Sequence, residues 1–180
     1  MIFTELPLPG AFAVDMQRLA DERGFFARAY CAEEFSARGL TPELRQCSVS
    51  YNARRGTLRG MHFQSAPHEE HKLVRCTAGA IFDVIVDIRA TSATYRRWYG
   101  TDLTEDNRRS LFIPPGFAHG FVSLTDRTEV YYMISMPHAP LFARGLRWND
   151  PAIAIQWPLT PVMVSARDAA FPLLDAPTGT

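Results

Sequence analysis

The segment from Ser110 to Leu124 reads SLFIPPGFAHGFVSL. It places two short, largely apolar runs, at 110–113 and 120–124, on either side of the turn residues Pro114, Pro115 and Gly116. Short apolar runs that are separated by proline and glycine are typical of strands joined by tight turns. This segment therefore predicts two strands of an antiparallel β-structure.

Strand patterns continue on both sides of that segment. Further strands are expected at 57–64, 72–76, 81–88, 95–103 and 128–135, with turn residues at Gly79 and at Thr125-Asp126. A clear helix pattern occurs only at 32–38, where Gly39 would close it, and the tail from 157 to 168 predicts a loop with one helical turn. Many short strands with little helix predict an all-β sandwich or barrel with a short C-terminal helical segment.

Length and composition narrow the class of protein. A chain of 180 residues predicts a single domain over 1–180. The 19 basic and 19 acidic side chains leave no net charge, so we expect no nucleic-acid partner. No apolar run approaches the roughly 18 residues of a membrane span, and Met1–Glu5 is no signal peptide, so we expect a cytoplasmic protein without a membrane partner.

The cysteines point to the same compartment. Cys31, Cys47 and Cys76 are odd in number, widely separated and never in a CxxC pair. That usage predicts free thiols in a reducing environment rather than disulfides or a zinc site.

Several polar residues fall on strands that should form a core. They are Arg59, His62, Lys72, Tyr131 and Tyr132, and His119 follows the turn after Pro114. Burying such groups without partners costs on the order of 1–3 kcal/mol each. A barrel that keeps them together is expected to enclose a ligand pocket. The alternative is that they lie on the outer face of a half-exposed sheet.

Alternation along two strands assigns their faces. In the strand at 57–64, it places Leu58, Gly60, His62 and Gln64 on one face, and Arg59, Met61 and Phe63 on the other. In the strand at 81–88, it places Asp83 and Asp87 with the apolar residues Ile81 and Ile85. Tyr131 and Tyr132 are adjacent, so one must face inward and the other outward.

Two short patterns resemble the sequence motifs of cupins. They are Gly60-x-His62, and Pro114-x-Gly116-x-x-His119 after a strand. The resemblance implies a jelly-roll barrel. A metal-binding cupin usually has His-x-His in its first motif, whereas Gln64 follows His62 here, so no metal is expected. A metal-dependent cupin oxygenase or isomerase remains an alternative, with His68 and His71 in the nearby loop.

Seven ordered blocks between about Asp21 and Pro172 make the resemblance specific. The chain resembles the dTDP-4-dehydrorhamnose 3,5-epimerases and their nucleotide-sugar relatives. The matching blocks are 21–26, 58–64, 72–75, 82–89, 113–121, 148–151 and 165–168. The block from Ile113 to Phe121 is the most specific of them.

The resemblance implies an isomerase that inverts C3, C5 or both in a nucleotide-linked 4-keto-6-deoxyhexose, in deoxysugar and polysaccharide biosynthesis. It implies His62 as the base, Asp168 as its partner, Tyr132 as the acid on the opposite ring face and Lys72 as the group on the ketone oxygen. It implies no cofactor, because the ketone is already the electron sink. Implied substrate contacts are Arg23, Phe26, Gln46, Arg59, His119 and His138. The resemblance also implies a homodimer, with Arg23 and Phe26 reaching into the partner's site.

The chain departs from the family pattern at five positions, which carry Arg28, Cys47, Ser48, His138 and Ala143. In the family these positions contact the nucleotide or frame the sugar. Because of these departures, the sequence does not identify the nucleotide base or the sugar of the substrate. A 3- or 5-monoepimerase is therefore an alternative. A non-catalytic sugar-nucleotide binding protein is the alternative outside the enzymes, although a binder has no need of an acid–base pair.

Overall fold

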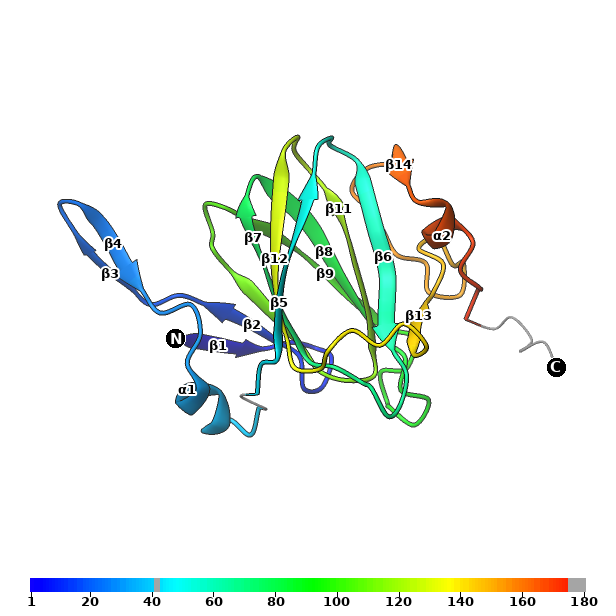
Figure 1. Cartoon of the computed structure of the whole chain (residues 1–180), viewed down its shortest axis with the longest axis horizontal. Helices are drawn as coiled ribbons and strands as arrows, with labels where there is room; N and C mark the ends of the chain where they lie inside the picture. The colour runs from blue at the N-terminus through cyan, green and yellow to red at the C-terminus, as the bar shows by residue number, and fades with distance from the viewer. Residues whose placement is uncertain (41–42, 175–180) are drawn as a thin grey trace.

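A computed structural model describes residues 1–40 and 43–174 of the chain (Figure 1). The N-terminal elements are β1 (Ile2–Glu5), β2 (Phe12–Asp15), β3 (Arg18–Asp21), β4 (Gly24–Ala27) and α1 (Ala32–Ser36). The central strands are β5 (Gln46–Asn52), β6 (Thr57–Gln64), β7 (Lys72–Ala78), β8 (Ala80–Asp87), β9 (Trp98–Thr104), β10 (Ser110–Ile113), β11 (Phe117–Ser123) and β12 (Thr128–Ile134). The chain continues with β13 (Ala143–Gly145), β14 (Met163–Val164) and α2 (Ala166–Ala169). No described helix is long and apolar enough to cross a membrane.

The described strands form two large sheets and one hairpin. The first sheet has the order β1-β2-β10-β7-β12-β5, and the second has the order β13-β6-β11-β8-β9 with β14 beside β6. Every strand pair is antiparallel except β14 with β6. The two sheets enclose the barrel, whereas the hairpin of β3 and β4 projects away from it (Figure 1). The predicted all-β jelly roll is confirmed.

Side chains between the two sheets form the main core. Residues of β7, β8, β10, β11 and β12 contribute Val74, Cys76, Ile81, Ile85, Leu111, Ile113, Phe117, Phe121 and Val130, all nearly inaccessible to solvent. In each strand these residues alternate with residues of the outer face, as expected for sheets that face each other. The alternation predicted for β8 is confirmed, because Ile81 and Ile85 lie in this core.

Several predicted boundaries differ from those observed. The strand predicted at 95–103 begins only at Trp98, because Arg96 takes a positive φ of 68° and its N–H donates to the Asp87 carbonyl in a turn. The strand predicted at 120–124 begins earlier, at Phe117, and the predicted helix ends at Ser36. The helical turn expected in the tail is α2. The strands before residue 53 and the short β13 and β14 were not predicted. Apart from β5, which alternates polar and apolar residues over seven positions, none of them is longer than four residues.

The three cysteines are free thiols, as predicted from their spacing. Cys76 lies in the core, and burial raises the pKa of its thiol to about 11. A thiol with so high a pKa is inert at neutral pH, so Cys76 acts as a small apolar core residue.

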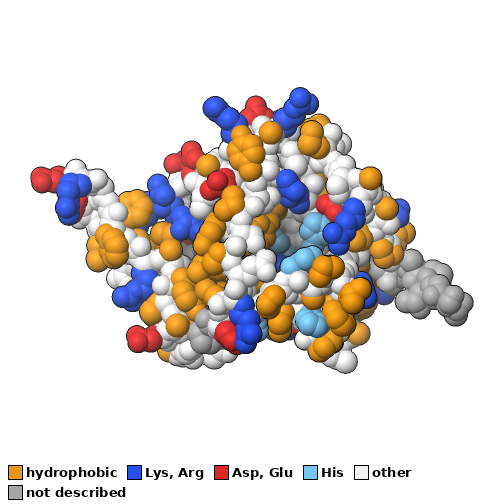
Figure 2. Space-filling model, in the orientation of Figure 1, with side chains coloured by type: hydrophobic (Ala, Val, Ile, Leu, Met, Phe, Trp, Pro, Cys, Tyr) orange, Lys and Arg blue, Asp and Glu red, His pale blue; other side chains and the backbone are white. Residues whose placement is uncertain are grey.

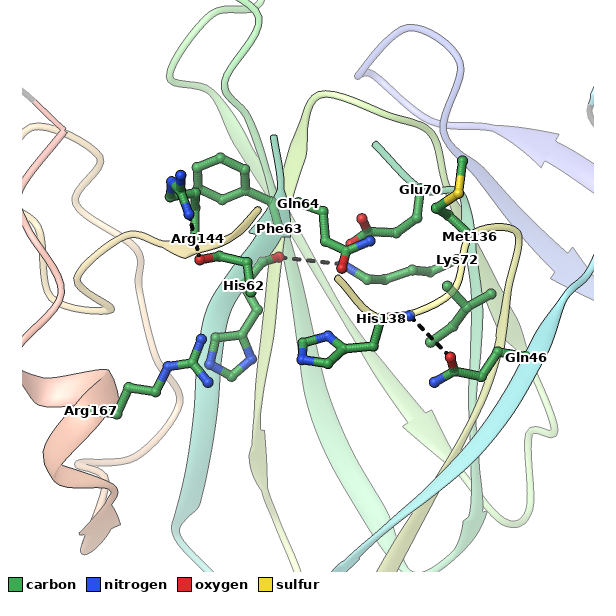
Figure 3. Close-up of a pocket in the computed structure, with 12 residues that line it drawn as sticks. Gln46, His62, Phe63, Gln64, Glu70, Lys72, Met136, His138, Arg144 and Arg167 are labelled. Atoms are coloured by element: carbon green, nitrogen blue, oxygen red, sulfur yellow. Dashed lines mark hydrogen bonds and ion pairs between the residues drawn. The ribbon is translucent and has the colours of Figure 1, made fainter. Parts of the chain in front are cut away.

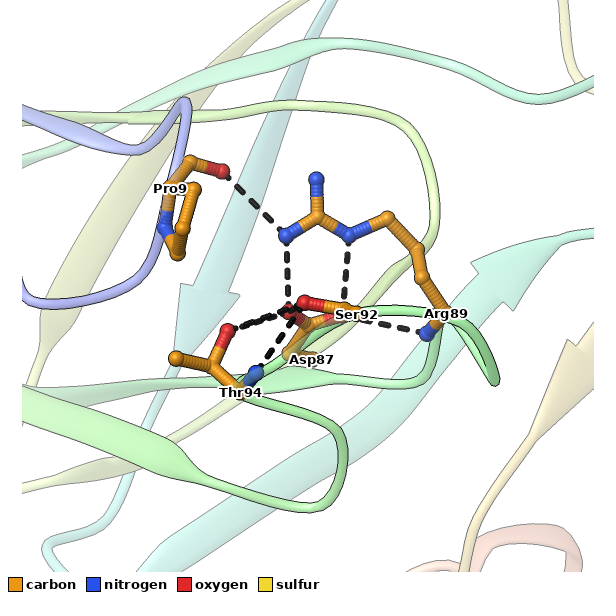
Figure 4. Close-up of polar contacts among 5 residues, drawn as sticks. All are labelled: Pro9, Asp87, Arg89, Ser92 and Thr94. Carbon is orange, nitrogen blue, oxygen red and sulfur yellow. Dashed lines mark hydrogen bonds and ion pairs between the residues drawn. The ribbon is translucent and has the colours of Figure 1, made fainter.

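One buried carboxylate ties the end of β8 to the loop that follows it (Figure 4). Asp87 is fully buried, and its oxygens accept hydrogen bonds from the Arg89 guanidinium and from the Ser92 and Thr94 hydroxyls. Arg89 also donates to the Pro9 carbonyl, which lies in the connection between β1 and β2. Burial raises the pKa of the Asp87 carboxyl, but these hydrogen bonds outweigh burial and lower the pKa from 3.8 to about 2.

This network predicts a specific loss of stability in acid. A folded-state pKa below the unfolded value stabilises the protein above pH 4, and that stabilisation disappears as the pH falls from about 4 to 2. A shift of this size corresponds to about 2 kcal/mol. Asp87→Asn is therefore expected to lower the free energy of unfolding by about 2 kcal/mol at pH 7, and by much less near pH 2.

Urea unfolding at both pH values measures the effect. The matched control is Glu43→Gln, because Glu43 also pairs with an arginine two residues later, Arg45, but both side chains are more than half exposed. We expect no more than about 0.5 kcal/mol from the control. An equal loss at both pH values for Asp87→Asn would show that the carboxylate charge does not supply the stability.

Candidate active site

An irregularity in β6 shapes the site. His62 pairs with His119, whereas Arg59 pairs with Phe121, so the register shifts between them. Paired residues of antiparallel strands project to the same side, and both His119 and Phe121 face the barrel interior. His62 and Arg59 therefore both start on the inward face. The prediction that Arg59 lies on the face opposite His62 was wrong, because a bulge adds one residue and reverses the alternation.

Glycine makes this irregularity possible. Gly60 has a φ of 139°, and a Cβ there would lie 2.6 Å from the Cα of Gly120 on the neighbouring strand. Met61, the next residue, is fully buried in the core cluster of Val84 and Val86 outside the barrel. A side chain at position 60 would therefore have to push apart two strand backbones as well as adopt a strained φ.

We expect Gly60→Ala to destabilise the fold by at least about 3 kcal/mol, since strain and a backbone clash add together. Gly39→Ala is the matched control, because Gly39 also has a positive φ, 69°, but has nothing within 4 Å of its Cβ position. The control isolates the strain alone and should cost about 1–2 kcal/mol. Thermal unfolding of both variants measures the difference, and equal losses would refute the steric role of Gly60.

His62 forms a dyad with Asp168. The His62 Nε2 lies 2.8 Å from Asp168 Oδ1, and Asp168 Oδ2 accepts a second hydrogen bond from the Gly60 N–H at 3.2 Å. Asp168 belongs to the short helix α2, whose N-cap Ser165 accepts from the Asp168 N–H. Burial raises the pKa of the Asp168 carboxyl, but the hydrogen bonds from His62 and from the Gly60 N–H lower it by more, so the net shift is downward. Asp168 is therefore a carboxylate at neutral pH.

The dyad fixes which nitrogen of His62 is available. A carboxylate can only accept hydrogen bonds, so Nε2 of a neutral His62 carries the proton that it donates to Asp168. The lone pair is then on Nδ1. The His62 side chain is 43% exposed, whereas that of Asp168 is 6% exposed. The buried Asp168 therefore orients the imidazole ring, and part of the ring is accessible to a ligand. This arrangement suits a general base.

A second dyad lies deeper in the barrel. The Nε2 of His119 lies 2.8 Å from Asp83 Oδ1, and both residues are almost completely buried. The Tyr132 ring packs edge-on against the His119 ring, with 5.8 Å between the centroids. Burial raises the pKa of the Tyr132 phenol, the nearby Asp83 carboxylate raises it further, and Arg59 lowers it by a smaller amount. The phenol is therefore protonated throughout the neutral range.

Lys72 supplies a cation in the wall of the site. It begins β7, and its ammonium contacts Glu70 Oε1 at 2.7 Å and the His62 carbonyl oxygen at 3.4 Å. Both partners are buried, with side-chain exposures of 11% for Lys72 and 6% for Glu70. The ion pair holds the ammonium beside the His62 backbone.

Two hollows meet at the His62–Asp168 dyad. The first, of about 220 Å³, is lined by His62, Lys72, Gln46, His138, Ala143 and Arg144, among others. The second, of about 440 Å³, is lined by Arg59, Asp168 and the segment around Ser165. His62 and Arg167 line both hollows. Figure 2 shows histidine side chains in a hollow of this face with basic side chains around it, and Figure 3 shows His62, His138, Lys72 and Arg167 pointing toward one another.

Most of the predicted site residues lie at these hollows. The contributing positions are His62, Asp168, Lys72, Arg59, Gln46 and His138. Gln46 Oε1 accepts a hydrogen bond from the His138 backbone N–H and so connects β5 to the loop after β12. Tyr132 and His119 lie in the barrel interior, in the sheets that carry Lys72 and His62 respectively.

Arg23 and Phe26 are not brought to the site within this chain. They lie on the projecting hairpin of β3 and β4, where Arg23 pairs with Asp21 and Phe26 is 75% exposed. Arg28, one of the departures from the family pattern, pairs with Glu34 of α1 at the base of the same hairpin.

The other departures divide into two groups. His138 and Ala143 line the first hollow, so they affect its shape and chemistry. Ser48 pairs with Tyr132 and therefore faces inward, where it accepts a hydrogen bond from Gln46. Cys47 is exposed on the outer face, next to Tyr131. Position 47 cannot contact the hollow of its own chain.

Sequence reasoning did not assign four residues of this region. Arg144 and Arg167 line the hollows, Glu70 pairs with Lys72, and Asp83 pairs with His119. Alternation placed Asp83 on the same face as the apolar Ile81 and Ile85. A carboxylate on an apolar face needs a buried partner, and this need was the available signal for His119. Glu70 precedes β7 in a stretch that reads as a loop, and no pattern marks it.

Gln64 has a structural use here. Its amide donates to the His68 carbonyl at 2.9 Å, and its oxygen accepts from the Ala139 N–H at 2.6 Å. Among residues 1–40 and 43–174, no three His, Cys, Asp or Glu side chains gather as metal ligands.

Similar proteins share both the sequence and the fold. The dTDP-4-dehydrorhamnose 3,5-epimerase of Salmonella typhimurium is 41% identical over 179 residues, which cover 97% of this chain and 96% of the relative. The crystal structure of dTDP-4-dehydrorhamnose 3,5-epimerase from Bacillus anthracis with TDP and PPi bound superimposes with a TM-score of 0.92 at 39% identity, covering 96% of this chain and 98% of that chain. ChmJ, a 3'-monoepimerase from Streptomyces bikiniensis in complex with dTDP-quinovose, gives 0.87 at 30% identity, with coverages of 94% and 86%.

The jelly-roll fold and these relatives place the chain in a class, the isomerases built on a cupin-type barrel. The sequence model of dTDP-4-dehydrorhamnose 3,5-epimerase matches residues 5–176. The chain belongs to the dTDP-4-dehydrorhamnose 3,5-epimerase family, and it is an enzyme of the epimerase type.

Proposed function

We propose that this chain inverts C3, C5 or both in a dTDP-linked 4-keto-6-deoxyhexose, by proton transfer through an enolate. The observation that carries the proposal is the His62–Asp168 dyad, with His62 partly exposed at the meeting point of two hollows. The family membership of the chain and the TDP named in the Bacillus anthracis structure support the substrate class.

The proposed roles follow from the positions of the groups. His62 Nδ1 removes the proton from the carbon beside the ketone, while Asp168 stabilises the imidazolium that forms. The Lys72 ammonium stabilises the negative charge that develops on the ketone oxygen. No metal or organic cofactor is needed for this step, because the ketone accepts the electron pair.

The two sheets supply groups to opposite faces of a bound ring. His62 lies on β6 of one sheet, and Tyr132 lies on β12 of the other. Inversion requires that a proton leaves one face of the carbon and returns on the other. Tyr132, a protonated phenol across the barrel from His62, is the proposed acid, and His119 beside it completes the polar wall.

Arginines beside the dyad suit the diphosphate. Arg59 and Arg167 both line the second hollow, and a guanidinium can bind phosphate oxygens with two parallel hydrogen bonds. Gln46 and His138 line the first hollow, where the sugar would lie. We propose that Arg59 and Arg167 bind the diphosphate and that Gln46 and His138 contact the sugar.

We further propose a homodimer, which would give Arg23 and Phe26 a place in the site. The hairpin of β3 and β4 projects from the barrel with Leu19 and Phe26 exposed by 66% and 75%. An arm of this kind supports exchange between two subunits, each hairpin reaching the other's hollow. Sedimentation equilibrium tests the assembly, and a monomer at the concentrations of the activity assay would contradict it.

A monoepimerase is the second candidate. His138 and Ala143 depart from the family pattern and line the hollow where the ring would bind, and ChmJ, a 3'-monoepimerase, shares the fold. The distinction between one carbon and two therefore rests on how these residues orient the ring.

Conversion of the substrate tests the function. The chain is incubated with dTDP-4-keto-6-deoxyglucose, and new epimers are followed by proton NMR, with the GDP-linked sugar as the control for the nucleotide. We expect conversion of the dTDP sugar only. Binding of both nucleotides without conversion would favour the non-catalytic alternative.

A further inference from the structure

Lys72 is the only lysine in the chain, among 19 lysine and arginine residues. Everywhere else the sequence uses arginine for a permanent positive charge. Lysine differs from arginine by a compact ammonium with three rotatable donors in place of a broad planar fork. The one lysine is buried and lines the first hollow. The wall of the first hollow thus carries a compact cation, the only one of its kind in the sequence.

The carboxylate that holds this cation has an unusual hydrogen-bond pattern. Glu70 contacts the Lys72 ammonium through Oε1, while its Oε2 is buried and has no hydrogen-bond partner among the described residues. The buried carboxylate of Asp87, in contrast, uses both oxygens to fasten a loop. A buried oxygen without a donor destabilises the fold. Stabilising the loop is thus a poor explanation for the burial of Glu70, and orienting Lys72 is a better one.

The geometry leaves the ammonium with a definite direction. Lys72 Nζ lies between Glu70 Oε1, at 2.7 Å, and the His62 carbonyl oxygen, at 3.4 Å (Figure 3). The long side chain of a lysine otherwise samples many rotamers, and ordering it without a partner is costly. Glu70 lines the hollow with Lys72 and restricts the cation to the side where His62 is attached.

We propose that Glu70 is a positioning residue, whose buried carboxylate directs the Lys72 ammonium at the oxygen that becomes negative in the reaction. This inference rests on the proposed function, since the oxygen in question is that of the 4-ketone. Glu70 itself does not contact the reacting atoms. It acts through Lys72 alone.

Kinetics of Glu70→Gln test the proposal, because glutamine keeps the shape and an acceptor but loses the charge. An ammonium that matters when charge develops affects the transition state more than substrate binding. We expect kcat to fall by about 10- to 100-fold and KM to change by less than about 3-fold. Glu70→Asp should recover part of kcat. The matched control is Glu69→Gln, whose side chain is exposed, and it should retain wild-type kcat.

A double-mutant cycle separates positioning from a general structural effect. If Glu70 acts only through Lys72, adding Glu70→Gln to Lys72→Met lowers kcat no further. Losses that multiply in the double variant, or a wild-type kcat in Glu70→Gln, would overturn the proposal.

A second readout does not depend on turnover. Because the chain has one lysine, limited reductive methylation with formaldehyde followed by mass spectrometry reports Lys72 separately from the N-terminal amine. The N-terminal amine pairs with Glu34 in every variant and serves as the internal reference. We expect Lys72 in Glu70→Gln to react at least about 5-fold faster than in the wild type, since it is released from its ion pair, and Glu69→Gln to show no change.

The two readouts distinguish the possible failures. Equal methylation in Glu70→Gln and the wild type would refute the positioning of Lys72 even in an active enzyme. Lys72 could instead react faster in Glu70→Gln while the wild-type chain shows no epimerisation. That result would support the positioning of Lys72 by Glu70 and refute the proposed function.

Discussion

A His62→Ala chain is expected to lose about a thousandfold in the rate of proton exchange at the inverted carbons, within the range that general acid–base catalysis supplies. The loss should appear in kcat, because the imidazole acts on the proton during the reaction. Binding of dTDP, measured by calorimetry, should change by less than about 3-fold, since the proposed diphosphate contacts are Arg59 and Arg167. Together these results would assign the base to His62.

The matched control for His62 is another histidine near the same hollow. His68 follows β6, and its ring stacks on Phe142 with the centroids 4.3 Å apart. It has no carboxylate partner among the described contacts and does not line either hollow. His68→Ala should therefore exchange protons at close to the wild-type rate. Equal exchange in His62→Ala and His68→Ala would remove His62 from the mechanism.

A Tyr132→Phe chain is expected to separate proton removal from inversion. The variant deletes one hydroxyl from a ring that packs against His119, so the barrel should keep its shape. Without an acid on the far face, net inversion should fall by about 100- to 1,000-fold. Exchange of the proton with solvent should fall much less, because His62 can return a proton to the face it came from. This difference between exchange and inversion is the signature of the proposed acid.

The neighbouring tyrosine supplies the control. Tyr131 pairs with Val49, which is exposed by 58% on the outer face of the sheet, and its hydroxyl interacts with Cys47. Tyr131→Phe therefore makes the same chemical change one residue away and on the other side of the strand. We expect both exchange and inversion to stay within about 2-fold of the wild type. A larger loss of inversion in Tyr131→Phe than in Tyr132→Phe would show that Tyr131, and not Tyr132, is the acid.

Much of the barrel could be predicted from local sequence. The turn at Pro114–Gly116 and the alternation of Ile81, Asp83 and Ile85 are local features, and the structure confirms both. Strand ends were less predictable. Trp98 begins β9 three residues later than expected because a positive φ at Arg96 depends on a contact with Asp87, which local sequence does not reveal.

The site was predictable in part, and for a different reason. His62 and Asp168 are 106 residues apart, so only the resemblance to a family could connect them. Alternation then misplaced Arg59, because one extra residue in the bulge at Gly60 reverses the faces of β6. A bulge depends on the neighbouring strand, here on the small Gly120, and one strand's pattern does not contain that information.

The carboxylate partners of Lys72 and His119 were the hardest to predict. Glu70 lies outside any strand, and Asp83 lies on a strand face that already looked apolar. Each is identified by what it contacts, Lys72 in one case and His119 in the other. The His119–Asp83 contact arises from the pairing of β11 with β8. Glu70 lies only two residues before Lys72, but its contact depends on the burial of its side chain beside β7.

Isotope exchange into the substrate is the most direct test of the proposed reaction. The wild-type chain is incubated in deuterium oxide with dTDP-4-keto-6-deoxyglucose, and C3 and C5 are followed by NMR. We predict that deuterium enters C3, C5 or both, and that His62→Ala lowers the rate of entry about a thousandfold. Entry at both carbons identifies a 3,5-epimerase, and entry at one carbon identifies a monoepimerase. In a monoepimerase, we propose that His138 and Ala143 orient the sugar ring of the substrate. No deuterium at either carbon, with the dTDP sugar bound, would contradict the proposed proton transfer.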